Sequence, residues 1–340
     1  MPQREANNFA GWKGLCLIGM SFNHLLLWPF PGLSPALRLT YQSVGWFTFA
    51  SVFFAIAGIQ WGRRAQSNTK LILWNIKRAK KLGLWIVLAT SLFLVGIKLG
   101  LITPAPWQIS IAWQQPQTLL YALLGLRLPW LIDVIWLHMW LGVFATLLWI
   151  SPGIRGRWWA IACVSFALWC LGQSNDPLGL GTNADAPSWH HWTSWQLLFV
   201  VSALSQQDEV RKKLAVLNFP EHRKYILAAA ILFFILKHIQ VQSNQEQLSA
   251  AQRFSPLFAV NTAVLLLAAK PYQSIRFPAF VSTVGHQSLA AYSAQCMVVY
   301  ILGTHSKWFP PSPIAAFLLV ILFSTFIASS AHLFEKRSKA

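Results

Sequence analysis

Long apolar stretches recur along the whole chain, and they constrain its fold more than any other feature. About ten such stretches occur, each near the length that a helix needs to cross a bilayer. A soluble protein of 340 residues would alternate polar and apolar faces, whereas 55% of these residues are hydrophobic and only 11% are charged. We therefore predict an all-α, polytopic membrane protein with about ten transmembrane helices in one bundle. One integral-membrane domain would cover residues 1–340.

The expected spans alternate with short polar connections. They are 10–30, 39–61, 82–102, 130–150, 158–173, 192–207, 225–241, 256–270, 285–303 and 313–333. Residues 103–128 are only partly apolar, so we expect an amphipathic or re-entrant segment there and no full crossing. Most of the 27 Lys and Arg residues fall in alternate connections, which by the positive-inside rule places both termini in the cytoplasm.

The composition also argues against several classes of protein. The net charge of +18 does not indicate a nucleic-acid partner, because the cations lie between the apolar runs. The four cysteines fall inside expected spans without a Cys-x-x-Cys pair, and the pair His190–His191 lacks a third ligand at a suitable spacing. We therefore expect neither a disulfide framework nor a metal site. ATP-driven transport and zinc proteolysis have no supporting motif.

The first span carries two ionisable groups, Lys13 and His24. In a helix, residues eleven apart return to within about 20° of the same face and lie roughly 16 Å apart along the axis. Ionisable groups inside a membrane segment are costly, which makes them candidates for function. A neutral imidazole can take a proton from a hydroxyl that attacks an acyl group. Two ordinary alternatives stay open: Lys13 reaches the interface, and His24 bonds a backbone carbonyl.

The span 130–150 carries Asp133 and His138. Asp133 is the one acid of nine that falls inside an apolar run, and a carboxylate commonly holds the tautomer of a catalytic imidazole. Its expected depth is compatible with that of His24. As an alternative, Asp133 serves as a negative charge at a helix N-terminus. Five residues turn a helix by about 140° beyond a full turn, so Asp133 and His138 do not share a face.

A strongly basic segment precedes the third span. Lys77, Arg78 and Lys81 occupy neighbouring helical positions there. Such a cluster suits an anchor on anionic lipid, and it equally suits a cradle for a polyphosphate. The sequence leaves both interpretations open.

Several short motifs resemble one family of membrane enzymes. Lys13-x10-His24 resembles the Arg/Lys-x10-His signature of the acyltransferase-3 superfamily, and Arg78-x-x-Lys81 stands where that superfamily has Arg-x-x-Arg. The run beginning Trp195-Gln196-Leu-Leu-Phe resembles a stretch of the OpgC branch, which succinylates osmoregulated periplasmic glucans. Two further segments are similar to that branch, Pro129-x3-Asp133-Val-Ile and Gly285-His-Gln-Ser-Leu289.

The resemblance implies a multi-pass enzyme of the bacterial cytoplasmic membrane. Such an enzyme takes a succinyl or acetyl group from cytoplasmic acyl-CoA and gives it to a hydroxyl of an envelope carbohydrate. His24 would be the base and Lys13 the orienting cation, with Asp133 as the third catalytic group. Lys77, Arg78 and Lys81 would face the CoA phosphates. The expected substrate contacts are His138, Trp195, Gln196 and Gln295. The expected partners are the carbohydrate and membrane lipid, without metal or nucleic acid, and an oligomer stays open.

The chain also departs from the OpgC pattern. Ala10 and Ser51 stand where that branch has acids, and Ala57 replaces a serine. Trp136 and His138 stand where it has proline and tyrosine. Two other hypotheses therefore stay open. One is a proton-coupled transporter or flippase of an envelope intermediate that uses the same ionisable groups. The other is a catalytically inactive relative that acts as an assembly partner.

Overall fold

A computed structural model describes most of the chain. It covers residues 3–27, 46–67, 71–104, 117–126, 128–129, 131–151, 157–173, 187–215, 276–305 and 313–337, together with the single positions Trp113, Gln115, Tyr225, Ala228 and Leu232.

All the regular secondary structure of these residues is helical, which confirms the predicted all-α class. The helices are α1 (Gln3–Leu27), α3 (Trp46–Ser67), α4 (Leu71–Lys98), α5 (Thr118–Leu124), α6 (Asp133–Ile150), α7 (Trp158–Gln173), α8 (Pro187–Leu204), α9 (Asp208–Ala215), α13 (Ala279–His286), α14 (Ser288–Thr304) and α15 (Pro313–Arg337).

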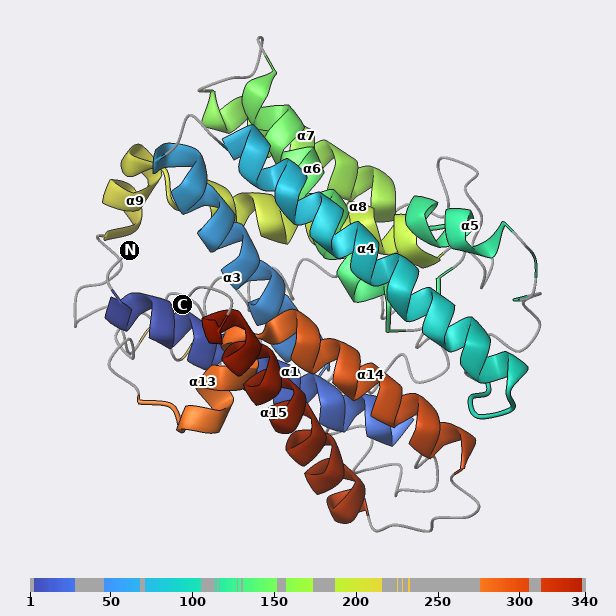
Figure 1. Cartoon of the computed structure of the whole chain (residues 1–340). Helices are drawn as coiled ribbons and strands as arrows, with labels where there is room; N and C mark the ends of the chain where they lie inside the picture. The colour runs from blue at the N-terminus through green and yellow to red at the C-terminus, as the bar shows by residue number, and fades with distance from the viewer. Residues whose placement is uncertain are drawn as a thin grey trace.

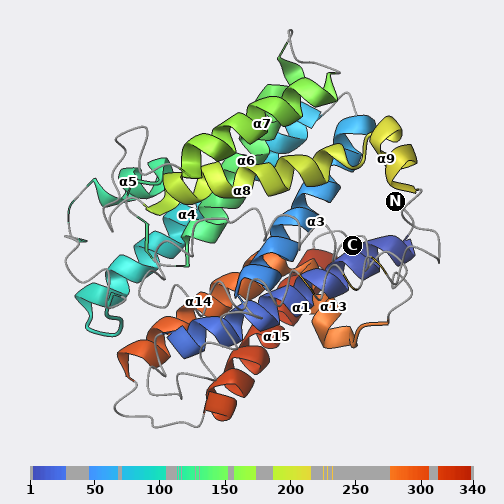
Figure 2. The ribbon, with the colours of Figure 1, turned by 180° about the vertical axis from the view of Figure 1, so that it is seen from behind.

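The long helices form two groups that α3 joins. Helix α1 packs with α13, α14 and α15, whereas α4, α6, α7 and α8 form the second group (Figure 1). Helix α3 packs against α1 on one side and α8 on the other, and the view from behind shows the same arrangement (Figure 2). One apolar core, which includes Leu17, Phe54, Trp136, Phe199 and Val299, runs through both groups. Residues far apart in the sequence therefore meet along α3.

Glycines allow the closest helix contacts. A Cβ atom at Gly285 would meet the carbonyl oxygen of Ala10, and one at Gly14 would meet the carbonyl oxygen of Val281. These positions bring the backbones of α1 and α13 together. Gly58 gives α3 the same close approach to α8 at Phe199. Small residues at such crossings are typical of helices that pack inside membranes, where close van der Waals contact drives association.

Three helices are long and apolar enough to cross a membrane by length and composition: α4, α6 and the part of α15 from Ile314 to Leu333. Four shorter helical segments of the described chain are also apolar, namely Phe9–Phe22, Trp158–Leu171, Trp195–Leu204 and Ser288–Thr304. The protein thus has the helices of a membrane protein, although the number of ten spans stays a prediction. The expected spans 225–241 and 256–270 lie outside the described residues, except for three single positions.

Two expected spans differ from the helices in ways that matter for the site. The span expected at 82–102 begins at Leu71 and ends at Lys98, so the basic segment forms the first turns of α4. The span expected at 285–303 corresponds to α14, which begins at Ser288, and a separate short helix, α13, precedes it and ends at His286. Gln287 has φ −100° and ψ 39°, outside the helical region. In the less apolar segment 103–128, the described residues form one short helix, α5.

Candidate active site

Helix α1 presents Lys13 and His24 on one continuous helix, as the sequence predicts. The Lys13 ammonium donates a hydrogen bond of 2.7 Å to the side-chain oxygen of Gln60 on α3. This bond turns Lys13 toward the neighbouring helix. His24 is 3% exposed, so protein encloses its imidazole almost completely. Helical geometry separates the two residues by roughly 16 Å along the axis, so they cannot touch one another.

A second cation, Arg78 of α4, lies near Lys13. The two positive charges are close enough to repel. The Arg78 guanidinium also lies 5.5 Å from the ring centre of Trp74, and that of Arg64 lies 5.1 Å from the same ring. Among the side chains that the structure describes, no carboxylate pairs with Lys13 or Arg78. Lys77 and Lys81 of the same helix are exposed at the surface of the protein.

His138 of α6 lies in the same region. Its imidazole stacks on Phe54, with ring centres 4.5 Å apart, and meets the edge of Phe53 at 4.9 Å. The residue is 8% exposed, and neither ring nitrogen has a hydrogen-bond partner within the described part of the chain. The imidazole also lies within electrostatic range of the positive charges of Arg78 and Lys13. The fold thus gathers Lys13, Arg78 and His138 from three helices.

One stripe of α6 faces this region. One turn beyond His138, Gly142 leaves room for the side-chain oxygen of Asn75 on α4. One turn further, Thr146 accepts a hydrogen bond of 3.3 Å from the indole of Trp61 on α3. Positions four apart lie on one helix face, so His138, Gly142 and Thr146 form a single line toward α3 and α4.

Asp133 faces a different part of the molecule. Its carboxylate accepts a hydrogen bond of 2.9 Å from the backbone of Val134 in the first turn of α6. Its charge acts on Cys296 and Tyr300 of α14. The hydroxyl of Tyr292, one turn before Cys296, donates to the carbonyl oxygen of Leu131 at 2.8 Å. Asp133 and His138 therefore face different helices, as their spacing predicts, and a role for Asp133 beside His24 stays a prediction.

The other expected substrate contacts, Trp195, Gln196 and Gln295, are all buried but differ in their hydrogen bonds. Trp195 of α8 is buried against Phe54, with ring centres 4.8 Å apart, so it supports the ring on which His138 stacks. Gln196 accepts from the Ser165 hydroxyl and donates to the Ser165 carbonyl, both at 2.6 Å, which ties α8 to α7. Gln295 is 1% exposed, and its side-chain oxygen has no hydrogen-bond partner among the described residues. Direct contacts of these residues with substrate stay predictions.

Three residues of the site, Gln60, Phe54 and Trp74, are not among the site residues that the motifs in the sequence predict. Gln60 is an amide near the end of an apolar run, and that polarity was an available signal. Phe54 and Trp74 are ordinary apolar residues in a chain with 19 Trp and 23 Phe, so nothing marks them before the packing is known.

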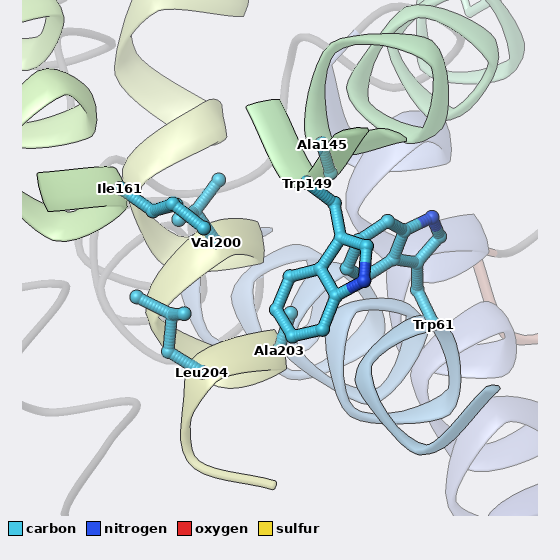
Figure 3. A pocket seen from close by; sticks show the side chains of 7 residues that line it. All are labelled: Trp61, Ala145, Trp149, Ile161, Val200, Ala203 and Leu204. Carbon is cyan, nitrogen blue, oxygen red and sulfur yellow. The ribbon is translucent and has the colours of Figure 1, made fainter. Parts of the chain in front are cut away.

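Two pockets lie away from this site. One lies between α3, α6, α7 and α8, where Figure 3 shows the indoles of Trp61 and Trp149 on one side and Ile161, Val200 and Leu204 on the other. The other lies between α4, α6 and α14 and is apolar apart from Ser293, Cys296 and Tyr300. None of the described residues that line either pocket has a charged side chain. In the described part of the chain, no three His, Cys, Asp or Glu side chains gather as metal ligands would.

The fold and the site define a class: an α-helical membrane protein with half-buried cations and buried imidazoles between its helices. The sequence pattern of the family described as OpgC protein matches residues 10–339, nearly the whole chain. The chain therefore belongs to the OpgC family, which implies a transferase role of the membrane acyltransferase kind on glucans. No curated protein and no solved structure matches it.

Proposed function

We propose that the protein transfers an acyl group, succinyl or acetyl, from cytoplasmic acyl-CoA to a hydroxyl of an envelope carbohydrate. It would do so as a multi-pass protein of the bacterial cytoplasmic membrane. The donor enters from the side of Arg78 and the carbohydrate from the opposite side. His24 is the general base.

In the reaction, His24 takes the proton of the sugar hydroxyl as its oxygen attacks the carbonyl carbon of the thioester. The tetrahedral intermediate then collapses, and the bond from carbon to sulfur breaks. The CoA thiolate leaves and takes the proton back from the imidazolium. One ester is formed for each thioester consumed, and the base returns to its neutral state.

The observation that carries this proposal is the pair of cations, Lys13 and Arg78, near one another and without a described carboxylate partner. Both side chains are half-buried, and charges withdrawn from water are normally paired, so two such cations are suited to an anionic ligand. Phosphate groups are strong acceptors for guanidinium and ammonium donors. The buried His24 lies further along α1, as expected if phosphates and reacting carbon occupy opposite ends of one path.

Mass analysis of envelope glycans tests the proposal directly. Glycans would be compared between cells that produce the protein and cells that lack it. We expect an added acyl mass only when the protein is present, and the mass identifies the acyl group. Identical glycans from both cells, with the protein verified in the membrane, would contradict the proposal.

The break at Gln287 favours a second candidate, a proton-coupled transporter or flippase. Interrupted helices occur at the substrate sites of transporters. Thermal unfolding with and without acyl-CoA separates the candidates, because a ligand that binds the folded state raises its stability. Stabilisation supports the acyltransferase, whereas an unchanged unfolding temperature favours the transporter or the inactive relative.

A further inference from the structure

His138 is a buried polar group without a hydrogen-bond partner in the described structure. Both ring nitrogens are inaccessible and unbonded, and the side chain is 8% exposed. Leaving such groups unsatisfied costs free energy, so they are rare in folded proteins unless a ligand or water completes them. Phe53 and Phe54 fix the plane of the ring, and Trp195 in turn supports Phe54. The imidazole is therefore held in place without bonds of its own.

The position of His138 along the bundle follows from three contacts. Lys13 bonds Gln60, and Gly19 lies directly against Phe49, so α1 and α3 run antiparallel. Moving along α3 from Gln60 toward Phe49 therefore means moving along α1 from Lys13 toward His24. Phe54, on which His138 stacks, lies about 9 Å from Gln60 in that direction. His138 thus lies at a level between Lys13 and His24.

The part of the proposed donor that would lie between Lys13 and His24 has a characteristic chemistry. If its phosphates lie at Lys13 and Arg78 and its thioester lies at His24, the segment between them is the pantetheine arm. That arm carries two amide groups, each with one N–H donor and one carbonyl acceptor. A neutral imidazole likewise has one donor nitrogen and one acceptor nitrogen.

We infer that His138 binds the pantetheine arm of acyl-CoA, with its two ring nitrogens hydrogen-bonded to amide groups of that arm. This inference rests on the proposed function and adds a specific subsite to it. His138 is a binding residue here and takes no part in proton transfer. Its two nitrogens would make the binding site selective for CoA thioesters over ligands that carry only the phosphate end.

Two ligands separate this subsite from the phosphate site. Coenzyme A contains the pantetheine arm, whereas adenosine 3′,5′-bisphosphate lacks that arm and carries two of the three phosphates. Binding of each would be measured by calorimetry on the purified full-length protein in detergent. His138→Phe keeps an aromatic ring for stacking and removes both polar atoms. We expect it to weaken CoA binding about tenfold and to change the affinity for the bisphosphate less than about twofold.

Two controls sharpen the result. His138→Gln restores one donor and one acceptor, and we expect it to recover most of the lost CoA affinity. Arg78→Gln should weaken both ligands alike. Without ligand, His138→Phe should unfold at the same or a higher temperature than the wild type, because it removes unsatisfied polar atoms. A purely structural role for His138 would instead lower that temperature. If His138→Phe does not fold, His138→Leu takes its place.

The outcomes are distinguishable. If the wild type binds neither ligand, the proposed donor is wrong and the inference fails with it. If the wild type binds CoA, but His138→Phe leaves its affinity unchanged or weakens both ligands equally, the inference alone is overturned. Selective loss of CoA affinity with recovery in His138→Gln supports it.

Discussion

Helices α6 and α15 are both strongly apolar, but they have very different surroundings. Both contain a segment long and apolar enough to cross a membrane, yet 50% of that window is buried inside the protein in α6 and only 22% in α15. Helix α6 carries His138 in the interior, whereas α15 exposes Leu322 and Phe326 on its outer face. Hydropathy alone therefore does not reveal which span carries a polar site. Burial by neighbouring helices makes that difference.

The contrast between interior and outer helices is tested most strongly by two histidine substitutions. His24 of α1 is buried, whereas His332 belongs to the outer helix α15 and is only partly buried. We expect His24→Ala to lower acyl transfer to envelope glycan by about 10²- to 10⁴-fold, which is typical for loss of a general acid or base. His332→Ala should leave transfer nearly unchanged. Acyl incorporation would be normalised to protein level in the membrane. Full activity of His24→Ala would remove His24 from the mechanism.

Two leucines give the matching test of stability. Leu141 of α6 is 0% exposed and Leu322 of α15 is 68% exposed. We expect Leu141→Ala to destabilise the protein by about 2–5 kcal/mol, because it leaves a cavity in the core. Leu322→Ala should change the free energy of unfolding by no more than about 0.5 kcal/mol. Denaturant unfolding in detergent micelles measures both. Equal effects would show that α6 is not more deeply packed than α15.

Two glycines compare a tight helix crossing with a loose one. A Cβ at Gly285 would meet backbone of α1, whereas the nearest atom to a Cβ at Gly83 is the Met139 sulfur at 3.6 Å. We expect Gly285→Ala to cost about 1–3 kcal/mol by forcing α13 away from α1. Gly83→Ala should be neutral or stabilising, since alanine favours helix by about 1 kcal/mol. Unfolding temperatures rank the pair, and a harmless Gly285→Ala would contradict the close crossing.

The smallest expected effect distinguishes two cations of α4. Arg78 is half-buried beside Lys13, and Lys81 is exposed. We expect Arg78→Gln to weaken CoA binding about tenfold, because a charge-assisted hydrogen bond is lost. Lys81→Gln should change it by less than about twofold at physiological salt, where exposed charges are screened. Calorimetry at two salt concentrations measures both. A larger loss of CoA affinity in Lys81→Gln than in Arg78→Gln would show that the phosphates bind on the exposed face of α4.

Much of the candidate site could be predicted because it depends on local geometry. The helical repeat alone places Lys13 and His24 on one face, and α1 is indeed continuous through both. The same repeat separates Asp133 from His138, which face α14 and α3 respectively. The break at Gln287 was missed, because Gln287 and its neighbours fit a helical pattern. That break lies beside the close contact between Gly285 and α1, which no local pattern encodes.

The sequence by itself determined the helical membrane class, the pairing of Lys13 and His24 on one helix, and membership of the OpgC family. Only the tertiary structure decided that His138 meets Phe54 and the charges of Lys13 and Arg78, and that Gln196 bonds Ser165. The physical reason is that periodicity is a property of one helix. The rotation and depth at which helices pack depend on close contacts, such as those at Gly14 and Gly58, between segments distant in the sequence.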